Sequence, residues 1–172
     1  MVKLIGSAII LFSATMVGWQ VGKLYAMRPV QLRTLLIALQ MLETEIVYGS
    51  TPLHRAFVKI GRRMAKEIGG IFLTAAELMG TAEALSTQVC WQTAVEQHWS
   101  QTVLRKEEKD VLLNLGYVLG SSDRHDQQKH LRLTMTHLRG LEEEARLEQG
   151  KYENMYKSLG FLGGLLVVIL ML

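Results

Sequence analysis

The chain has 172 residues, of which 49% are apolar, and a formal net charge of +3. All 16 acidic residues lie between Glu43 and Glu153, whereas residues 4–22 and 158–172 carry no charge of either sign. This uneven distribution excludes a disordered chain and a plain soluble globule, and the single cysteine, Cys90, excludes a disulfide-stapled module and a cysteine-based metal cluster.

The first predicted element is the uncharged stretch at residues 4–22. At about 1.5 Å per residue it would form about 28 Å of helix, close to the hydrocarbon thickness of a bilayer. Lys23, Arg28 and Arg33 follow it and only Lys3 precedes it, so the charge bias places the downstream side in the cytoplasm. We predict an N-terminal transmembrane helix. A cleaved secretory signal is the alternative, although the stretch is long for one.

The middle of the chain, residues 28–157, is predicted to form a cytoplasmic domain of helices. It carries 17 Lys and Arg against the 16 acids, a net +1 that disfavours nucleic-acid binding as its main role. Pro29 suits a first helical position, and Gly69-Gly70 suits a helix end. Apolar spacings of three and four predict helices at about 30–48, 52–68, 71–79, 86–103, 106–119 and from about 123 onward.

The predicted helix at 52–68 has one apolar and one basic face. At about 100° per residue, Leu53, Phe57, Ile60 and Met64 fall within about 60° of one another. The opposite side carries the basic residues Arg55, Lys59, Arg62, Arg63 and Lys66. This face is a candidate contact for anionic headgroups or for an acidic partner surface, and an ordinary solvated face is the alternative.

The last predicted helix carries a seven-residue apolar repeat that Thr134 and Glu148 interrupt. Its members are Leu131, Leu138, Ala145, Tyr152 and Leu159, with Leu141, Met155 and Leu162 at intermediate positions. The helix is expected to run unbroken into residues 158–172, a C-terminal transmembrane segment of about 22 Å that is short for a full span. A packed C-terminal core helix is the alternative.

Each uncharged end contains two glycines four residues apart, Gly18 with Gly22 and Gly160 with Gly164. In lipid, small residues at this spacing let two helix backbones approach closely. We therefore expect the two transmembrane segments to pack on each other or on a partner, although such pairs also arise by chance in glycine-rich apolar helices.

No sequence pattern indicates an enzyme or a cofactor. Asp126, His130 and His137 share a predicted helix and allow a metal site to be imagined, but HExxH is missing and Lys129 and Arg132 would repel a cation. Solvated histidines are the better interpretation. We expect no catalytic residue, no cofactor site and no metal site.

Three separated segments resemble the stage III sporulation protein AB family of endospore-forming bacteria. They are LETEIVYGSTPLHRAF at 42–57, LGSSDRHDQQKHL at 119–131 and KYENMYKSLGFLGGLLVVILML at 151–172. That family is in turn similar to the F-type inner-membrane platform domain of type II secretion systems, through Glu45–Leu53 and the turn at Leu119–Asp123. The resemblance implies an all-α fold, an antiparallel bundle of about six helices tethered by a membrane helix at each end. The platform proteins have two such domains and three membrane anchors, whereas this chain is expected to have one domain and two anchors.

The resemblance also implies a function and partners. The chain would be a non-enzymatic platform in the complex that links mother cell and forespore, in the mother-cell membrane, with the bundle facing the cytoplasm. Its expected partners are a secretion-type ATPase, stage III sporulation protein AA, and the other stage III sporulation A-set channel proteins. Association with further copies of the same chain is an additional alternative. The candidate contacts are the basic face and the 119–131 turn with Ser122 and Asp123. Alternatives are a membrane-surface protein and a metal-dependent membrane-bound enzyme.

Overall fold

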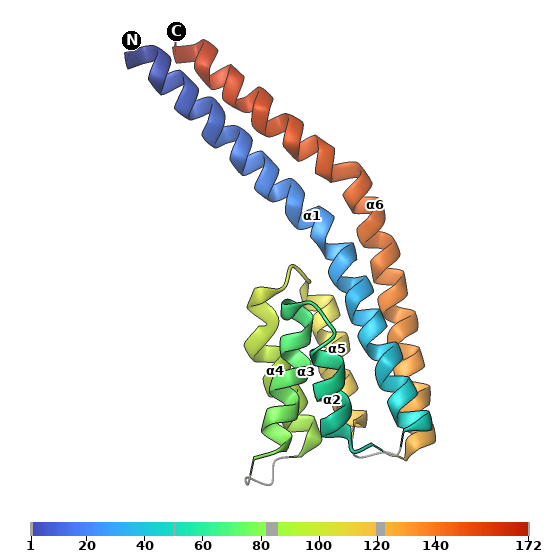
Figure 1. The fold of residues 1–172 in the computed structure, drawn as a ribbon. Coiled ribbons are helices and arrows are strands. Elements are labelled where there is room, and N and C mark those ends of the chain that lie inside the picture. The colour runs from blue at the N-terminus through green and yellow to red at the C-terminus, as the bar shows by residue number, and fades with distance from the viewer. Residues whose placement is uncertain (1, 50, 82–85, 120–122, 172) are drawn as a thin grey trace. The chain divides into compact units, whose positions relative to one another are not determined.

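The computed structural model describes residues 2–49, 51–81, 86–119 and 123–171. These residues form six α-helices and a short 3₁₀ helix, and none of them lies in a strand (Figure 1). The elements are α1 (Val2–Tyr48), α2 (Leu53–Gly61), α3 (Lys66–Met79), α4 (Thr87–His98), η1 (Trp99–Gln101), α5 (Lys106–Val118) and α6 (Arg124–Met171). The predicted all-α class with about six helices is confirmed.

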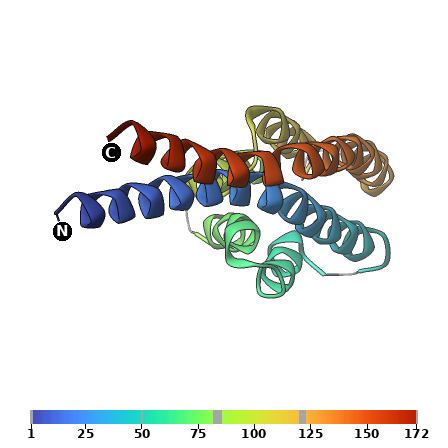
Figure 2. The ribbon, with the colours of Figure 1, turned by 90° about the horizontal axis from the view of Figure 1, so that it is seen from above.

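The chain divides into two compact units, and each contains part of α1 and part of α6. Met1–Pro29 and Glu143–Leu172 form one unit, here called the helix pair, and Val30–Glu142 form the other, called the bundle. Within each unit, the segments of α1 and α6 are antiparallel neighbours (Figures 1 and 2). The boundaries predicted at residues 22, 28 and 157 all fall inside these two helices, which continue through them.

The bundle encloses an apolar core to which all six α-helices contribute. Phe57 of α2, Phe72 of α3 and Trp91 of α4 pack ring against ring, with centroids 5.3–5.5 Å apart. Trp91 Nε1 donates a hydrogen bond to the Leu112 carbonyl of α5 at 2.7 Å, which satisfies the one polar atom of this buried side chain. Four leucines of α1, spaced three or four residues apart, are fully buried in the bundle: Leu32, Leu35, Leu39 and Leu42.

The prediction that Pro29 opens a separate helix is wrong. Pro29 lies inside α1, which runs without a break from Val2 to Tyr48. Proline removes one backbone donor and usually ends or kinks a helix. Here tertiary contacts outweigh that cost, because Pro29 is buried and the polar side chains of Arg28 and Gln31, on either side of it, form hydrogen bonds with other segments of the chain. Arg28 pairs with Glu148 in the helix pair, and Gln31 accepts from the Val103 amide in the bundle at 2.8 Å.

The predicted helix at 52–68 is two helices. Helix α2 ends at Gly61, and α3 begins at Lys66 and contains the glycines that were expected to close the helix. A Cβ on Gly69 would lie 2.5 Å from the Gly61 carbonyl oxygen, and a Cβ on Gly70 would lie 2.6 Å from His98 Nδ1. These glycines are therefore positions of close packing, where α3 meets α2 and the end of α4, rather than helix breakers.

The later boundaries agree better with the predictions. Helix α5 occupies Lys106–Val118, close to the predicted 106–119, and α6 begins at Arg124 and continues unbroken to Met171. The helix predicted at 86–103 is shorter, because α4 ends at His98 and the chain tightens into η1. Ser86 caps α4 by accepting from the Val89 amide at 3.3 Å.

Candidate membrane helices and interaction surfaces

The helix pair presents an apolar surface on both of its helices. Segments of α1 and α6 are long and apolar enough to cross a membrane. Within an apolar stretch of 18 residues in each, only 11% in α1 and 6% in α6 is buried inside the protein. Such low burial favours a lipid-facing helix over a packed C-terminal core helix, whose apolar side chains would be covered by protein. The exposed side chains include Phe12, Val17, Phe161, Leu166 and Leu170. Lipid tails would suit this surface.

All four glycines singled out in the sequence lie between α1 and α6. A Cβ on Gly18 would lie 2.8 Å from Gly160 Cα, and a Cβ on Gly160 would lie 2.8 Å from Gly18 Cα. Gly22 lies against the Lys157 side chain, and Gly164 against Ala14 and Leu11. The two backbones therefore approach each other within one chain, at the distance that only glycine permits.

Aromatic and charged residues lie just beyond the uncharged ends of the helix pair. Tyr25 of α1 stacks on Tyr156 of α6 with centroids 5.4 Å apart, and Tyr152 packs against both rings. Tyrosine rings of this kind suit the level of the lipid headgroups. Further along, Arg28 Nη1 donates to Glu148 Oε2 at 2.8 Å, so polar contacts replace glycine contacts between the two helices.

The five predicted basic residues are all exposed, but they do not lie on one helix. Arg55 and Lys59 belong to α2, Arg62 and Arg63 to the turn after it, and Lys66 to the first position of α3. A surface hollow is lined by Arg55, Val58, Lys59, Arg62 and Arg63. The five cations are here called the basic surface.

One acid of α1 partly neutralises the basic surface. Lys59 Nζ forms an ion pair with Glu45, and Thr51 Oγ1 donates to the same carboxylate at 3.4 Å. The hydrogen bond from Lys59 lowers the pKa of Glu45, against a smaller opposing effect of burial, and the charge of Arg63 lowers it further. Among the described residues, no acid forms an ion pair with Arg55 or Arg62, so the surface retains positive charge.

Asp123 has a structural role in the predicted turn. Its Oδ1 accepts from the Asp126 amide at 2.8 Å, which caps the first turn of α6. Asp123 is exposed. Ser122 lies outside the described residues.

The candidate metal ligands His130 and His137 do not belong to a cluster of metal-binding side chains among the described residues. Among the described residues, no group of three or more His, Cys, Asp or Glu side chains is arranged to hold a metal ion. His137 Nε2 lies 3.6 Å from Glu107 Oε1 of α5, and His130 is exposed.

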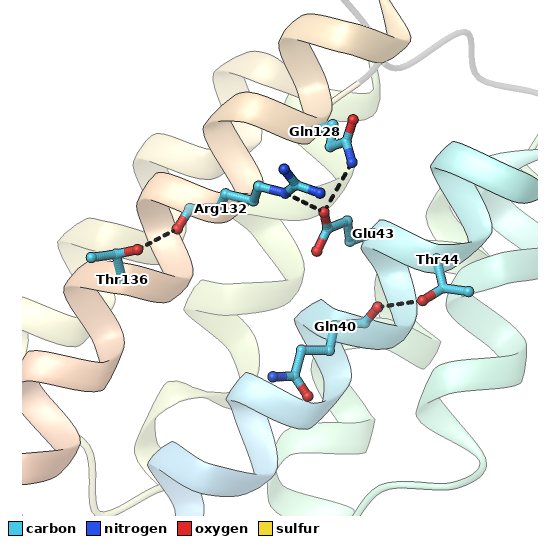
Figure 3. A network of polar contacts seen from close by, with 6 residues as sticks. All are labelled: Gln40, Glu43, Thr44, Gln128, Arg132 and Thr136. Atoms are coloured by element: carbon cyan, nitrogen blue, oxygen red, sulfur yellow. Dashed lines mark hydrogen bonds and ion pairs between the residues drawn. The ribbon is translucent and has the colours of Figure 1, made fainter.

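Sequence reasoning missed a polar contact between α1 and α6 in the bundle. Glu43 Oε1 accepts from Arg132 Nε at 2.6 Å and from Gln128 Nε2 at 3.1 Å (Figure 3). Burial raises the pKa of Glu43, but these hydrogen bonds and the charge of Arg132 outweigh it, so the pKa lies below its usual value. Gln128 and Arg132 are four residues apart on one face, which hints at a shared acceptor but does not identify a glutamate 85 residues away.

Two buried polar groups were missed as well. Gln31, 6% exposed, fastens the segment before α5 to α1 through the Val103 amide. Glu108, fully buried, accepts from the Arg105 amide at 2.7 Å and caps α5. The Glu at the third helical position is a sequence signal for such a cap.

Comparisons with known proteins agree with this architecture. A family model described as stage III sporulation protein AB matches residues 3–172. The chain is 40% identical over 172 residues to stage III sporulation protein AB of Bacillus subtilis (strain 168), and the alignment covers 100% of both chains. A solved structure of stage III sporulation protein AB is similar with a TM-score of 0.69 and 37% identity, over 73% of this chain and 98% of that chain. The chain therefore belongs to the stage III sporulation protein AB family.

Proposed function

We propose that the chain is a non-enzymatic platform of the sporulation complex that links mother cell and forespore. The helix pair anchors it in the mother-cell membrane, and the bundle lies in the cytoplasm. There the bundle binds a secretion-type ATPase, stage III sporulation protein AA, and couples it to the other stage III sporulation A-set channel proteins. The bundle acts as the F-type platform domain does in type II secretion.

The observation that carries this proposal is that α1 and α6 belong to both units. Each helix has an apolar part, in the helix pair, and a part whose leucines are buried in the bundle core. A partner that displaces the bundle would therefore act on α1 and α6, the two helices that are proposed to enter the membrane. The family match over residues 3–172 supports a place in a sporulation complex.

The proposed ATPase contact is the basic surface, with Asp123, which directly precedes α6, and its sequence neighbour Ser122 as a second region. Five exposed cations on two short helices and their connecting turn present a positively charged surface. Such a surface recognises acidic side chains, and charge across an interface mainly sets specificity and the association rate. The expected ATPase surface is therefore acidic.

The test uses the full chain in nanodiscs of neutral lipid and the purified ATPase, with binding measured by biolayer interferometry. We expect saturable binding that Arg62→Glu with Arg63→Glu weakens by about tenfold or more, because like charges then face each other. The matched control is Lys106→Glu with Arg139→Glu, which makes the same change in net charge on exposed positions of α5 and α6, outside the basic surface and the 119–131 segment. Both variants must keep the wild-type circular dichroism spectrum.

Three outcomes would count against this function. If the wild type does not bind the ATPase, the adaptor role is wrong. If both charge reversals weaken binding equally, the contact is not specific to the basic surface. If His130→Ala with His137→Ala abolishes binding, the histidine-based alternative gains support.

The gathering of cations also favours a second candidate, binding to an anionic membrane surface. In that case nanodiscs carrying the chain would recruit vesicles rich in phosphatidylserine. The recruitment would vanish at about 1 M salt, where the screening length falls to about 3 Å.

A further inference from the structure

The bundle carries a second charged surface, of opposite sign to the basic surface. It consists of two adjacent surface hollows, one on each side of α5, here together called the α5 groove. Asp110 and Asn114 line both hollows, one toward α4 and one toward α6. Glu107 lines the α6 side and Glu96 the α4 side.

The acids of the α5 groove are incompletely neutralised within the chain. Lys109 Nζ pairs with Glu96 Oε2 at 2.6 Å. Glu107 meets only the imidazole of His137, at 3.6 Å, and Asp110 forms no ion pair within the described part of the chain. Lys106 lines one end, so Glu107 and Asp110 leave the groove with an excess of negative charge.

Apolar side chains accompany these acids. Tyr117 on the α4 side and Leu133 on the α6 side are each 58% exposed, and both line the groove. Val111 and Leu113 are half-buried beneath them. A partly apolar surface with a charged rim is the usual composition of a protein interface. The basic surface has the matching arrangement, because half-buried Val58 lies among its arginines.

The two surfaces cannot neutralise each other within one chain. Within the bundle α2 packs on α3, α3 on α4 and α4 on α5. Figure 2 separates α2 from α5, which overlap in Figure 1, and places them on opposite sides of the bundle. Complementary surfaces on opposite sides of one molecule lead to head-to-tail association, in which each copy uses its two surfaces on two different neighbours.

We propose that the bundle binds a second copy of this chain head to tail, with the basic surface of one copy in the α5 groove of the next. Anchoring both copies in one membrane raises their effective concentration, so a modest interface suffices. The contact uses the basic surface that is also proposed for the ATPase. The two partners therefore compete for each copy, and ATPase binding releases one neighbour.

Cysteine cross-linking in neutral phosphatidylcholine liposomes tests the contact, with full chains and no ATPase. One variant carries Val58→Cys and the other Asn114→Cys, while native Cys90 is buried. We expect a disulfide-linked dimer when the two are mixed under mild oxidation and none from either alone. The control pair replaces Asn114→Cys with Thr136→Cys, on an exposed position of α6 outside the α5 groove.

Charge reversal makes the test specific. Adding Arg62→Glu and Arg63→Glu to the Val58→Cys chain should lower the cross-linked fraction about tenfold, and so should Glu107→Lys with Asp110→Lys in the Asn114→Cys chain. Combining the two reversed chains should restore it, because the attractive pairing returns with its signs exchanged.

The proposal is overturned if the wild-type pair cross-links no more than the control pair, or if the doubly reversed pair fails to recover. Recruitment of anionic vesicles without cross-linking would instead assign the basic surface to lipid. Failure of the ATPase contact is distinguishable, because Glu107→Lys with Asp110→Lys should leave ATPase binding intact while abolishing the cross-link.

Discussion

Arg28 of α1 and Glu148 of α6 form an ion pair in which Nη1 lies 2.8 Å from Oε2 and the arginine side chain is 5% exposed. Glu148 is one of two residues that interrupt the apolar repeat of α6. Its partner explains that interruption, because a buried guanidinium needs a carboxylate nearby. The pair lies beyond the tyrosines of the helix pair, where the contact between α1 and α6 changes from glycine to charge.

Glu148→Ala should destabilise the chain by about 3 kcal/mol, because it removes the carboxylate that compensates the buried arginine charge. Replacing both partners, Arg28→Met with Glu148→Leu, should recover most of this loss. The measurement is thermal unfolding of the full chain in nanodiscs, followed by circular dichroism. A double variant as unstable as Glu148→Ala would show that the charge balance is not what matters.

Gly160→Ala should loosen the helix pair, since its Cβ would lie 2.8 Å from both the Ala14 carbonyl oxygen and Gly18 Cα. Backbone atoms cannot move aside as a flexible side chain can. The matched control is Gly163→Ala, three residues along the same helix, where a Cβ meets nothing within 4 Å. We expect a lower melting temperature in nanodiscs for Gly160→Ala only. Equal effects from the two variants would mean that α1 and α6 are not in contact there.

Gly116→Ala should destabilise the bundle by about 1–3 kcal/mol, the range for overpacking a core. Its Cβ would lie 2.8 Å from Trp91 Cδ1, and moving Trp91 would also strain its hydrogen bond to the Leu112 carbonyl. Gly140→Ala, on an exposed turn of α6 where a Cβ meets nothing within 4 Å, should instead stabilise by about 0.5–1 kcal/mol. Urea unfolding of both variants gives the two signs, and a stabilised Gly116→Ala would contradict the packing described for Trp91.

Acid should weaken the bundle partly through Glu43. Its pKa is lowered from 4.5, because hydrogen bonds from Arg132 and Gln128 outweigh the effect of burial. The folded state therefore binds fewer protons than the unfolded state around and below that value, so this contribution is present above pH 4.5 and is lost as the pH falls through the folded pKa. Glu43→Gln should narrow the difference in urea midpoint between neutral and acidic solution. Arg132→Met keeps Glu43 but removes its partner, and it should also narrow this difference in urea midpoint. If Glu43→Gln shows the same difference in urea midpoint as the wild type, Glu43 does not contribute to the acid sensitivity.

Glycine and proline were the least dependable signals in this chain. By local preference Pro29 predicts a helix start and Gly69-Gly70 a helix end, yet all three residues lie inside helices. A glycine that breaks a helix and one that admits a neighbouring backbone look the same in the sequence. The Asp123 cap and the start of α5 were predictable because their determinants are adjacent in the chain.

The predictions for the charged residues also succeeded where the determinants are local in sequence and failed where they are not. The sequence predicted which cations share an exposed face, because helical periodicity is local. It could not show that Glu45 pairs with Lys59, or that Glu43 meets Arg132, since those partners come from distant segments. The α5 groove was missed for that reason, because its two walls come from α4 and α6.

By itself, the sequence determined the all-helical class, two apolar ends and a nearly neutral middle, since composition and periodicity are properties of short stretches, and the resemblance of three segments indicated the family. Only the tertiary structure decided that the two ends pack on each other through Gly18 and Gly160, that α1 continues through Pro29, and that opposite charges lie on opposite sides of the bundle. Each of these depends on contacts between residues far apart in the chain, whose packing outweighs the local preference of any one of them.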